Sequence, residues 1–460
     1  MRLAKAKFEK VGPFKDFSIE FKKNKKKNLA EVHILTGPNG SGKSTIIKTL
    51  AYFFGNSTSR NMEAVEIGGL FWTSGEKGSF VEAAGDLSKS PSVITTSGYD
   101  MGFGGVVTSH DDSFDPFHLY QKKSGHYRSS DKETRFDYVV FGYSGKRALR
   151  YPHFGSPYQD MSVSESSASG STSGYGNGNA GWNPLVSAID FEGRIPRELS
   201  VEEWVEDTFS RAAIAGQKGD KERQRITLST LRKFEEILCE ITERTIKFSV
   251  DVEVYKRTVV ELDGTEVEFG VLPDGLKSIL SWIGDLLMRM DSIRWEKKQS
   301  VFDQPIILFL DEIDIHLHPS WQMKILPIIQ KTFVNAQIFV STHSPFVVAS
   351  VEDAYVYDLN IDKDGFSYLE QAPILTERGQ SYIRVLQEVF DIEGEFVDSW
   401  SRNNLKAFNL LLEKTKSKNS KAYKDAQTIG AKLASENVEL RDIVSISLKQ
   451  LERRVSKPIA

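Results

Sequence analysis

Gly37-Pro38-Asn39-Gly40-Ser41-Gly42-Lys43-Ser44-Thr45 decides the fold of this chain, because it follows the phosphate-loop pattern of Gly, four residues, Gly, Lys and then Ser or Thr. Residues 30–36 before it are rich in branched apolar side chains, as in a strand, and apolar residues recur at helical spacing in residues 46–54 after it. A glycine-rich loop between a strand and a helix turns backbone amides and the helix N-terminus toward an anion. The sequence therefore predicts that all nine residues line a nucleoside triphosphate, with Lys43 reaching phosphate and Ser44 reaching magnesium.

A second segment supplies the carboxylates that such a site needs. Residues 305–310 form a nearly continuous apolar run, typical of a buried parallel strand, and Asp311 and Glu312 follow at its carboxyl end. We expect Asp311 to hold magnesium and Glu312 to orient or deprotonate an attacking water. An acidic pair at a strand end is more often a solvated loop, but beside a phosphate loop in one chain it indicates catalysis.

A third strand is predicted over residues 336–340, and Ser341-Thr342-His343 follows it. A lone His after a strand is usually structural or merely exposed. Here the preceding Ser-Thr and the order of the elements favour a catalytic His343 that approaches the terminal phosphate.

Together these residues resemble the ATPase heads of the ABC and SMC superfamily, and more closely the RecF-like and OLD-like bacterial ATPases. The resemblance implies an α/β fold, namely a P-loop ABC-type ATPase head with an irregular insertion and a helical C-terminal region. It also implies that the chain binds and hydrolyses ATP with Mg2+ as cofactor.

Residues 272–278 stand where this family's signature motif opens a helix. In the family this segment covers the nucleotide of a second protomer, which implies a homodimer or higher oligomer closed by an ATP sandwich. Pro273 and Asp274 replace the usual Ser and Gly, a departure that leaves the rate of hydrolysis open. A simple Pro-Asp-Gly turn before a core helix remains the alternative. The resemblance implies that three residues of the segment contact nucleotide in trans: Gly275, Lys277 and Ser278.

Three stretches, residues 272–278, 311–319 and 341–348, resemble the stand-alone ATPases of bacterial anti-phage systems: the Septu PtuA-like, retron-associated and PARIS AriA-like groups. The resemblance implies a regulatory or sensor scaffold that controls a separate effector, commonly a nuclease, with DNA or a phage protein as trigger. A RecF-like DNA-repair clamp is the alternative. A transporter ATP-binding subunit fits least, because such subunits are shorter between the phosphate loop and the signature.

His316 and His318 do not predict a metal site, because no further Cys or His lies at ligand spacing.

Composition indicates a cytoplasmic protein. No apolar run in the 460 residues approaches the ~20 that a membrane helix needs, the N-terminus lacks a signal-peptide core, and Cys239 is the only cysteine. The net charge of -4 argues against broad coating of nucleic acid, so any DNA contact must be local. The basic turn at residues 22–27 is either a solvated hairpin tip or such a contact.

Four regions are expected along the chain. Residues 1–55 and 199–375 form the two halves of the ATPase head, and 56–198 form an insertion with a flexible Ser/Gly-rich loop at about 162–183. Residues 376–460 are predicted to be helical, without a nuclease pattern, and either pack on the head or dock a partner. Helices are expected over 201–215, 221–243, 395–414, 421–435 and 438–455, and a hairpin over 248–269 with its turn near Asp263-Gly264.

Overall fold

The computed structural model describes residues 2–52, 54, 80–87, 90–97, 105–107, parts of 120–145 and 183–191, 201–252, 257–379, 384–386, 389, 399–415 and 420–455 except 437. The chain forms two compact units, residues 1–390 and 391–460. The strands are β1 (Leu3–Val11), β2 (Phe14–Glu20), β3 (Glu31–Thr36), β4 (Phe80–Leu87), β5 (Ser90–Ser97), β6 (Gly105–Val107), β7 (Val139–Tyr143), β8 (Ile189–Asp190), β9 (Ile246–Asp251), β10 (Arg257–Leu262), β11 (Thr265–Val267), β12 (Ile306–Leu310), β13 (Ala336–Ser341), β14 (Ala354–Ile361), β15 (Ser367–Leu369) and β16 (Ile374–Leu375). The helices are α1 (Lys43–Tyr52), α4 (Val201–Gln217), α5 (Lys221–Thr242), α6 (Asp274–Asp291), α7 (Pro319–Thr332), α8 (Pro345–Ser350), α10 (Ser399–Lys414), α11 (Lys421–Glu436) and α12 (Val438–Val455).

The larger unit is organised by a mostly parallel sheet in the order β15-β14-β3-β13-β12-β7-β8, with β16 also paired to β14. All neighbouring pairs from β14 to β8 are parallel. Every residue of β3, β12 and β13 is buried, which is why β12 reads as a continuous apolar run. The strands predicted over 30–36, 305–310 and 336–340 are therefore confirmed, and they are adjacent in the sheet.

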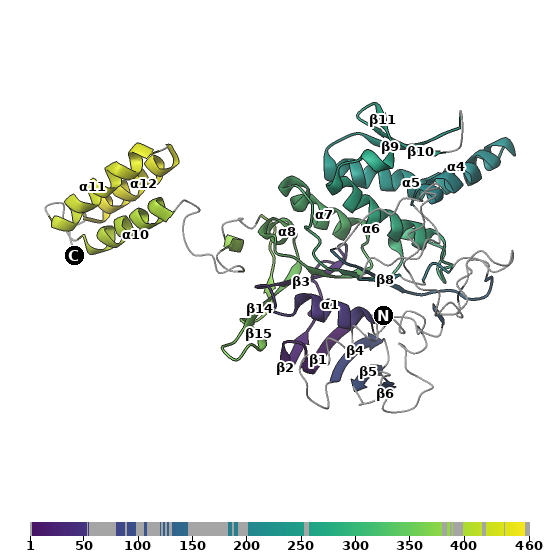
Figure 1. Ribbon diagram of the computed structural model, residues 1–460, viewed down its shortest axis with the longest axis horizontal. Helices are drawn as coiled ribbons and strands as arrows, with labels where there is room; N and C mark the ends of the chain where they lie inside the picture. The colour runs from purple at the N-terminus through teal and green to yellow at the C-terminus, as the bar shows by residue number, and fades with distance from the viewer. Residues whose placement is uncertain are drawn as a thin grey trace, which may run out of the picture. The chain divides into compact units, whose positions relative to one another are not determined.

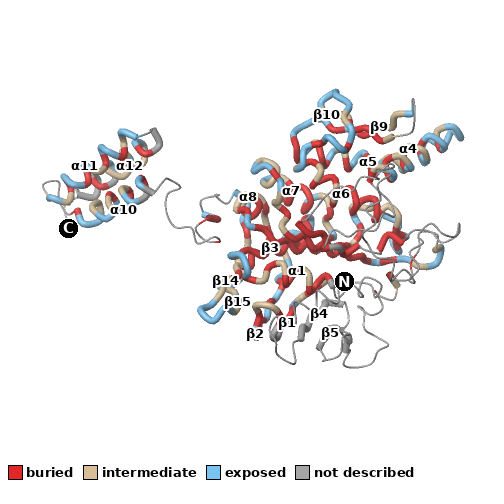
Figure 2. Tube along the Cα trace, in the orientation of Figure 1, coloured by how far each residue is buried: buried red, intermediate tan, exposed pale blue. Residues whose placement is uncertain are grey.

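The central sheet separates two layers (Figure 1). Helix α1 and an antiparallel sheet of order β2-β1-β4-β5-β6 lie on one side, and α6, α7 and α8 lie on the other. Figure 2 shows the central strands as the most continuously buried part of the molecule. The predicted α/β class is confirmed, and the buried sheet presents only its edges and strand ends for chemistry.

The predicted insertion at 56–198 is wrong as a separate region. Strand β7, inside it, pairs in parallel with β12, with Val140 opposite Ile307. Strand β4 pairs with β1, with Val81 opposite Phe8. Both sheets of the head thus contain strands from this range. Strands of five to eight residues are long enough to pair in a sheet even where the surrounding sequence is poor in apolar residues. Apart from Asn183, the expected Ser/Gly-rich loop lies outside the described residues.

The remaining boundaries need smaller corrections. The turn at Asp263-Gly264 joins β10 to β11 rather than β9 to β10. The second unit begins at residue 391, not at 376, since β16 (Ile374–Leu375) still belongs to the central sheet. No helix in the described parts of the chain is long and apolar enough to cross a membrane. In the second unit α10, α11 and α12 surround a small core of their own: Leu405, Phe408, Ala426, Leu433, Leu440 and Val444.

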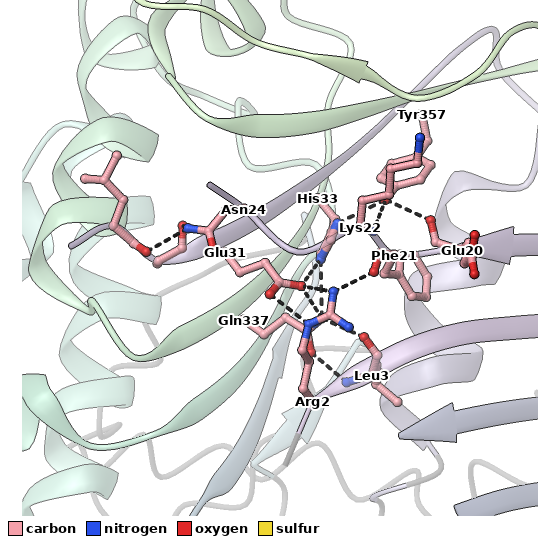
Figure 3. Close-up of polar contacts among 12 residues, drawn as sticks. Arg2, Leu3, Glu20, Phe21, Lys22, Asn24, Glu31, His33, Gln337 and Tyr357 are labelled. Carbon is pink, nitrogen blue, oxygen red and sulfur yellow. Dashed lines mark hydrogen bonds and ion pairs between the residues drawn. The ribbon is translucent and has the colours of Figure 1, made fainter. Parts of the chain in front are cut away.

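A buried polar cluster ties β1 to the amino end of β3 (Figure 3). The Glu31 carboxylate accepts from Arg2 Nε over 2.8 Å and from Gln337 Nε2 over 2.9 Å, and His33 Nε2 lies 2.7 Å from it. Gln337 also bonds both backbone groups of Leu3, over 2.8 Å each. Because a buried carboxylate is stable only with such partners, this cluster fixes where the second sheet attaches.

The cluster predicts a loss of stability on mild acidification. Burial lowers the pKa of His33 from 6.5, outweighing the hydrogen bond to Glu31 that acts in the other direction. The unfolded chain therefore takes up a proton more readily than the folded chain, and the free energy of unfolding decreases as the pH falls below 6.5, by up to about 1.4 kcal/mol per pH unit. In the His33→Gln variant this dependence is expected to shrink. Chemical unfolding of both proteins between pH 7.5 and 5 measures it, and equal slopes would contradict the assignment.

Candidate active site

The phosphate loop, the acidic pair and His343 follow three adjacent parallel strands and meet at one edge of the central sheet. The loop follows β3, His343 follows β13 and the acidic pair follows β12, with β13 between the other two strands. The carboxyl ends of parallel strands in an open sheet are the usual position of ligand sites. The structure thus brings together residues that the sequence places in three distant segments.

Two glycines give the phosphate loop its shape. Gly37 has a φ of +129°, and a Cβ there would clash with the carbonyl oxygen of Leu359 in β14. Gly42 has a φ of +88°, and a Cβ there would collide with the Phe14 ring and lie 2.9 Å from Cγ of Pro13. The loop is therefore pressed between β14 and the turn that joins β1 to β2, in a curve that only glycine permits.

Lys43 and Ser41 carry the polar groups of the loop. Lys43 Nζ donates to the carbonyl oxygens of Gly37 and Pro38 over 2.9 and 2.8 Å. Burial lowers the pKa of Lys43, while the carboxylates after β12 act in the opposite direction. The Ser41 hydroxyl is fully buried and has no hydrogen-bond partner within the described residues. A buried hydroxyl without a partner is unfavourable, so the loop suits a ligand that brings acceptor oxygens, as phosphate does.

The two predicted magnesium ligands are in direct contact. Ser44 Oγ donates to Asp311 Oδ1 over 2.8 Å, and Ser341 Oγ donates to the same oxygen over 2.5 Å. The Asp311 backbone N–H donates to the carbonyl oxygen of Tyr143 over 2.9 Å. A hydroxyl and a carboxylate at this separation, beside a phosphate loop, fit the oxygen ligands that Mg2+ takes from protein.

Glu312 is held in an unusual backbone conformation with a φ of +50°. Its N–H donates to Ser341 Oγ over 2.7 Å. Its side chain lies over Gly145, where an added Cβ would come within 2.9 Å of the Glu312 Cβ. A non-glycine residue with positive φ persists only where its surroundings enforce it, and such residues cluster at functional sites. Here the bond to Ser341 and the close approach to Gly145 hold Glu312 in place.

His343 is exposed at the end of β13. Partial burial of the ring lowers the pKa of His343, and the positive charge of Lys43 lowers it further. The negative charges of Asp314 and the acidic pair act in the opposite direction. A lowered pKa favours the neutral imidazole at neutral pH, which can donate or accept a hydrogen bond. Next to it, Thr342 Oγ1 donates to Asp314 Oδ1 over 2.6 Å, which links the loop after β13 to the loop after β12.

The predicted signature segment opens α6 on the side of the sheet opposite α1 (Figure 1). Gly275 packs against the loop after β12, since a Cβ there would lie 2.7 Å from the His316 carbonyl oxygen. Asp274 is exposed and Lys277 is partly exposed, but Ser278 is only 2% exposed and belongs to the core. In the same loop, His318 is the N-cap of α7, with Nδ1 accepting from the N–H of Ser320.

Sequence reasoning missed a set of residues that connects the site to α6. Tyr143, at the end of β7, donates its hydroxyl to Asp285 Oδ2 over 2.9 Å, and Arg289 Nε donates to the same oxygen over 2.7 Å. All three side chains are buried. The signal in the sequence was a charged pair four residues apart within the apolar stripe of α6. Gly145 and the bonds of Ser341 to the acidic pair were missed because only the folded sheet places these residues beside it.

The loop geometry predicts that Gly37→Ala is far more damaging than alanine at an exposed glycine turn. Gly365 has a φ of +85°, and no atom of the described residues lies within 4 Å of an added Cβ, so Gly365→Ala isolates the backbone strain of about 1–2 kcal/mol. Gly37→Ala adds the clash with Leu359 and is expected to lose nucleotide binding and a larger part of the stability. Thermal unfolding and binding of a fluorescent ATP analogue compare the two, and equal effects would count against the fixed loop.

Comparisons with known proteins find relatives of parts of this chain. The chain is 29% identical over 198 residues to the "Retron Ec83 probable ATPase" of Escherichia coli, 43% of this chain and 34% of that protein. It is 28% identical over 156 residues to the "Septu protein PtuA" of Bacillus thuringiensis, 33% of this chain and 39% of that protein. The chain therefore spans little more than a third of the length of these relatives.

Among solved structures, the SMC head bound to the C-winged helix domain of ScpA covers 82% of this chain and 99% of its own, with 13% identity and a TM-score of 0.45. A family model described as "AAA domain, putative AbiEii toxin, Type IV TA system" matches residues 32–349. That range takes in the phosphate loop, the signature segment, the acidic pair and His343, and it exceeds half of the chain. The chain therefore belongs to this family of AAA domains.

Proposed function

We propose that this chain binds and hydrolyses ATP as the regulatory or sensor scaffold of a bacterial anti-phage complex and controls a separate effector, a nuclease. The observation that carries the proposal is the contact between Ser44 and Asp311 over 2.8 Å, which joins the phosphate loop to the acidic strand end. We place the proposed activity in the cytoplasm, because it needs ATP.

In the proposed reaction the nine residues of the phosphate loop cradle the triphosphate, and Lys43 exchanges its carbonyl partners for phosphate oxygens. Ser44 and Asp311 would hold Mg2+, which neutralises charge developing on the phosphates. Glu312 accepts the proton of the attacking water, and the neutral imidazole of His343 hydrogen-bonds the terminal phosphate. The backbone bond from Glu312 to Ser341 sets the direction from which the carboxylate acts.

The second half of the proposed site comes from another copy of the chain. Helices α1 and α6 lie on opposite sides of the central sheet (Figure 1), which supports a signature segment that serves the nucleotide of another copy rather than that of its own phosphate loop. Gly275, Lys277 and the N-terminus of α6 would contact the nucleotide of a partner copy, closing a homodimer or higher oligomer. The core position of Ser278 restricts its proposed contribution to its backbone.

The anti-phage assignment is supported by the names of two relatives, a retron ATPase and a Septu protein. A controlled effector follows from the resemblance of the head to such ATPases, and DNA or a phage protein is the proposed trigger. The alternative is a DNA-repair clamp that acts on DNA without an effector.

The Glu312→Gln variant is expected to hydrolyse ATP at least 100-fold more slowly, because a general base typically contributes 10²–10⁴-fold. Its ATP affinity should stay within about twofold of wild type, since Gln keeps the size of the side chain. Purification with ATP and magnesium from cells that co-express the neighbouring genes, followed by mass measurement, should yield a complex with a second protein. An ATP-dependent homodimer alone, with DNA bound, would favour the repair clamp.

A mixing experiment tests the site shared between copies. Lys277→Glu is expected to lower hydrolysis about tenfold by placing a negative charge beside the partner's phosphates. Mixed with Glu312→Gln, it should recover about a quarter of the wild-type rate, because half of random dimers are mixed and each holds one intact site. Lys247→Glu, on the exposed face of β9, is the control and should be neutral. Failure of the mixture to exceed either variant alone would exclude the trans contact.

A further inference from the structure

The hairpin of α4 and α5 separates its charges along its length. Residues 211–233 surround its free end and hold seven basic and two acidic residues, a net charge of +5 on a chain of net charge -4. The base of the hairpin is acidic, and burial together with repulsion from Glu206 and Glu203 raises the pKa of Glu202 to about 6. The basic residues of the free end are Arg211, Lys218, Lys221, Arg223, Arg225, Arg232 and Lys233.

The free end stands in solvent. No residue from 216 to 229 is buried, whereas Trp204 and Phe234 pack at the base, where Gly284 of α6 adjoins the start of α4. In Figure 2 the end of the hairpin beside the α4 label is mostly coloured as exposed. A charged surface in this position is accessible to a large ligand from several directions.

Several of these cations form no ion pair within the part of the chain that the structure describes. Arg225 pairs with Glu222 over 3.0 Å, Lys233 with Glu236 over 2.9 Å, and Arg211 with two carboxylates. Asp220 is occupied as the N-cap of α5, accepting from a backbone N–H. Within the described residues four cations form no ion pair: Lys218, Lys221, Arg223 and Arg232.

Three cations lie along one side of α5. Lys221, Arg225 and Arg232 are spaced i, i+4 and i+11, so at 100° per residue they fall within about 40° of one another and span roughly 16 Å of the helix. Duplex DNA carries a negative charge about every 1.7 Å of its axis, so a stripe of this length meets several phosphates at once. Ile226, the exposed apolar residue of α5, lies on another side of the helix.

The composition of the free end favours a duplex backbone over other anionic partners. Four of its seven basic residues are Arg, whose planar fork matches phosphate oxygens. Residues 211–233 include no aromatic side chain, which single-strand binding sites use to stack bases. They also lack the cluster of aromatic anchors that energetically important protein contacts favour.

We propose that the free end of the α4–α5 hairpin binds the phosphate backbone of duplex DNA without reading its sequence. This site is separate from the ATPase site and does not depend on hydrolysis. The basic turn at residues 22–27 is a weaker candidate, because two of its backbone N–H groups bond Asp353 and Lys26 pairs with Glu352 over 2.6 Å.

The test is fluorescence anisotropy with two labelled 30-bp DNA duplexes of unrelated sequence, at ionic strengths from about 50 to 200 mM. The triple variant Lys221→Ala, Arg225→Ala, Arg232→Ala keeps good helix formers on exposed positions, and its melting temperature verifies folding. It should bind both duplexes at least tenfold more weakly than wild type. Its plot of log affinity against log salt should be shallower by about 2.7, for three lost phosphate contacts.

The matched control is Lys22→Ala, Lys23→Ala, Lys27→Ala, which removes the same charge from another exposed turn and should keep wild-type binding. ATP hydrolysis of the triple hairpin variant without DNA should equal wild type, so its result is independent of the proposed ATPase. The proposal is overturned if wild type does not bind DNA at 50 mM salt, if both triple variants lose affinity equally, if the salt dependence is unchanged, or if one duplex is strongly preferred.

Discussion

The Asp311 carboxylate is the constraint to which the rest of the site is fitted. It ends a fully buried strand, and one of its oxygens accepts hydrogen bonds from both Ser44 and Ser341. A buried carboxylate needs such donors, so the start of α1 and the end of β13 are both fixed against β12. The three strand ends thus hold one register, and a shift of any strand would break a bond at the centre of the site.

Further buried residues connect the strand ends to α6, whose start is proposed to meet a second copy of the chain. Tyr143 accepts the Asp311 N–H with its carbonyl oxygen and donates its hydroxyl to Asp285 of α6. Arg289 forms a buried ion pair with Asp285 through Nε, and its Nη1 donates to the Pro184 carbonyl oxygen. Breaking such a pair leaves a buried charge uncompensated, so α6 and β7 are expected to move together. Tyr143 therefore links the backbone at Asp311 to α6.

What the sequence predicted and what it missed differ in how local the signal is. The phosphate loop, the strands after which Asp311 and His343 lie, and the helices of the second unit rest on patterns within twenty residues. Strand β7 was assigned to an insertion because its neighbours are rich in Gly and Ser, and only pairing with β12 gives it a place in the sheet. The contributions of Ser341 and Gly145 likewise depend on contacts between strands far apart in the chain, which periodicity does not encode.

The buried cluster around Glu31 lies at the amino end of β3, opposite the phosphate loop at its carboxyl end. Strand β3 is buried along its length, so its polar side chains need buried partners, as His33 and Glu31 provide for each other. Its carboxyl end continues into the phosphate loop, and its amino end holds Arg2, which also donates to the Phe21 carbonyl oxygen. The second sheet is therefore anchored at one end of β3, while its β1–β2 turn, with Pro13 and Phe14, touches the phosphate loop at the other. Both ends of the strand thus place the second sheet where it limits the shape of the phosphate loop.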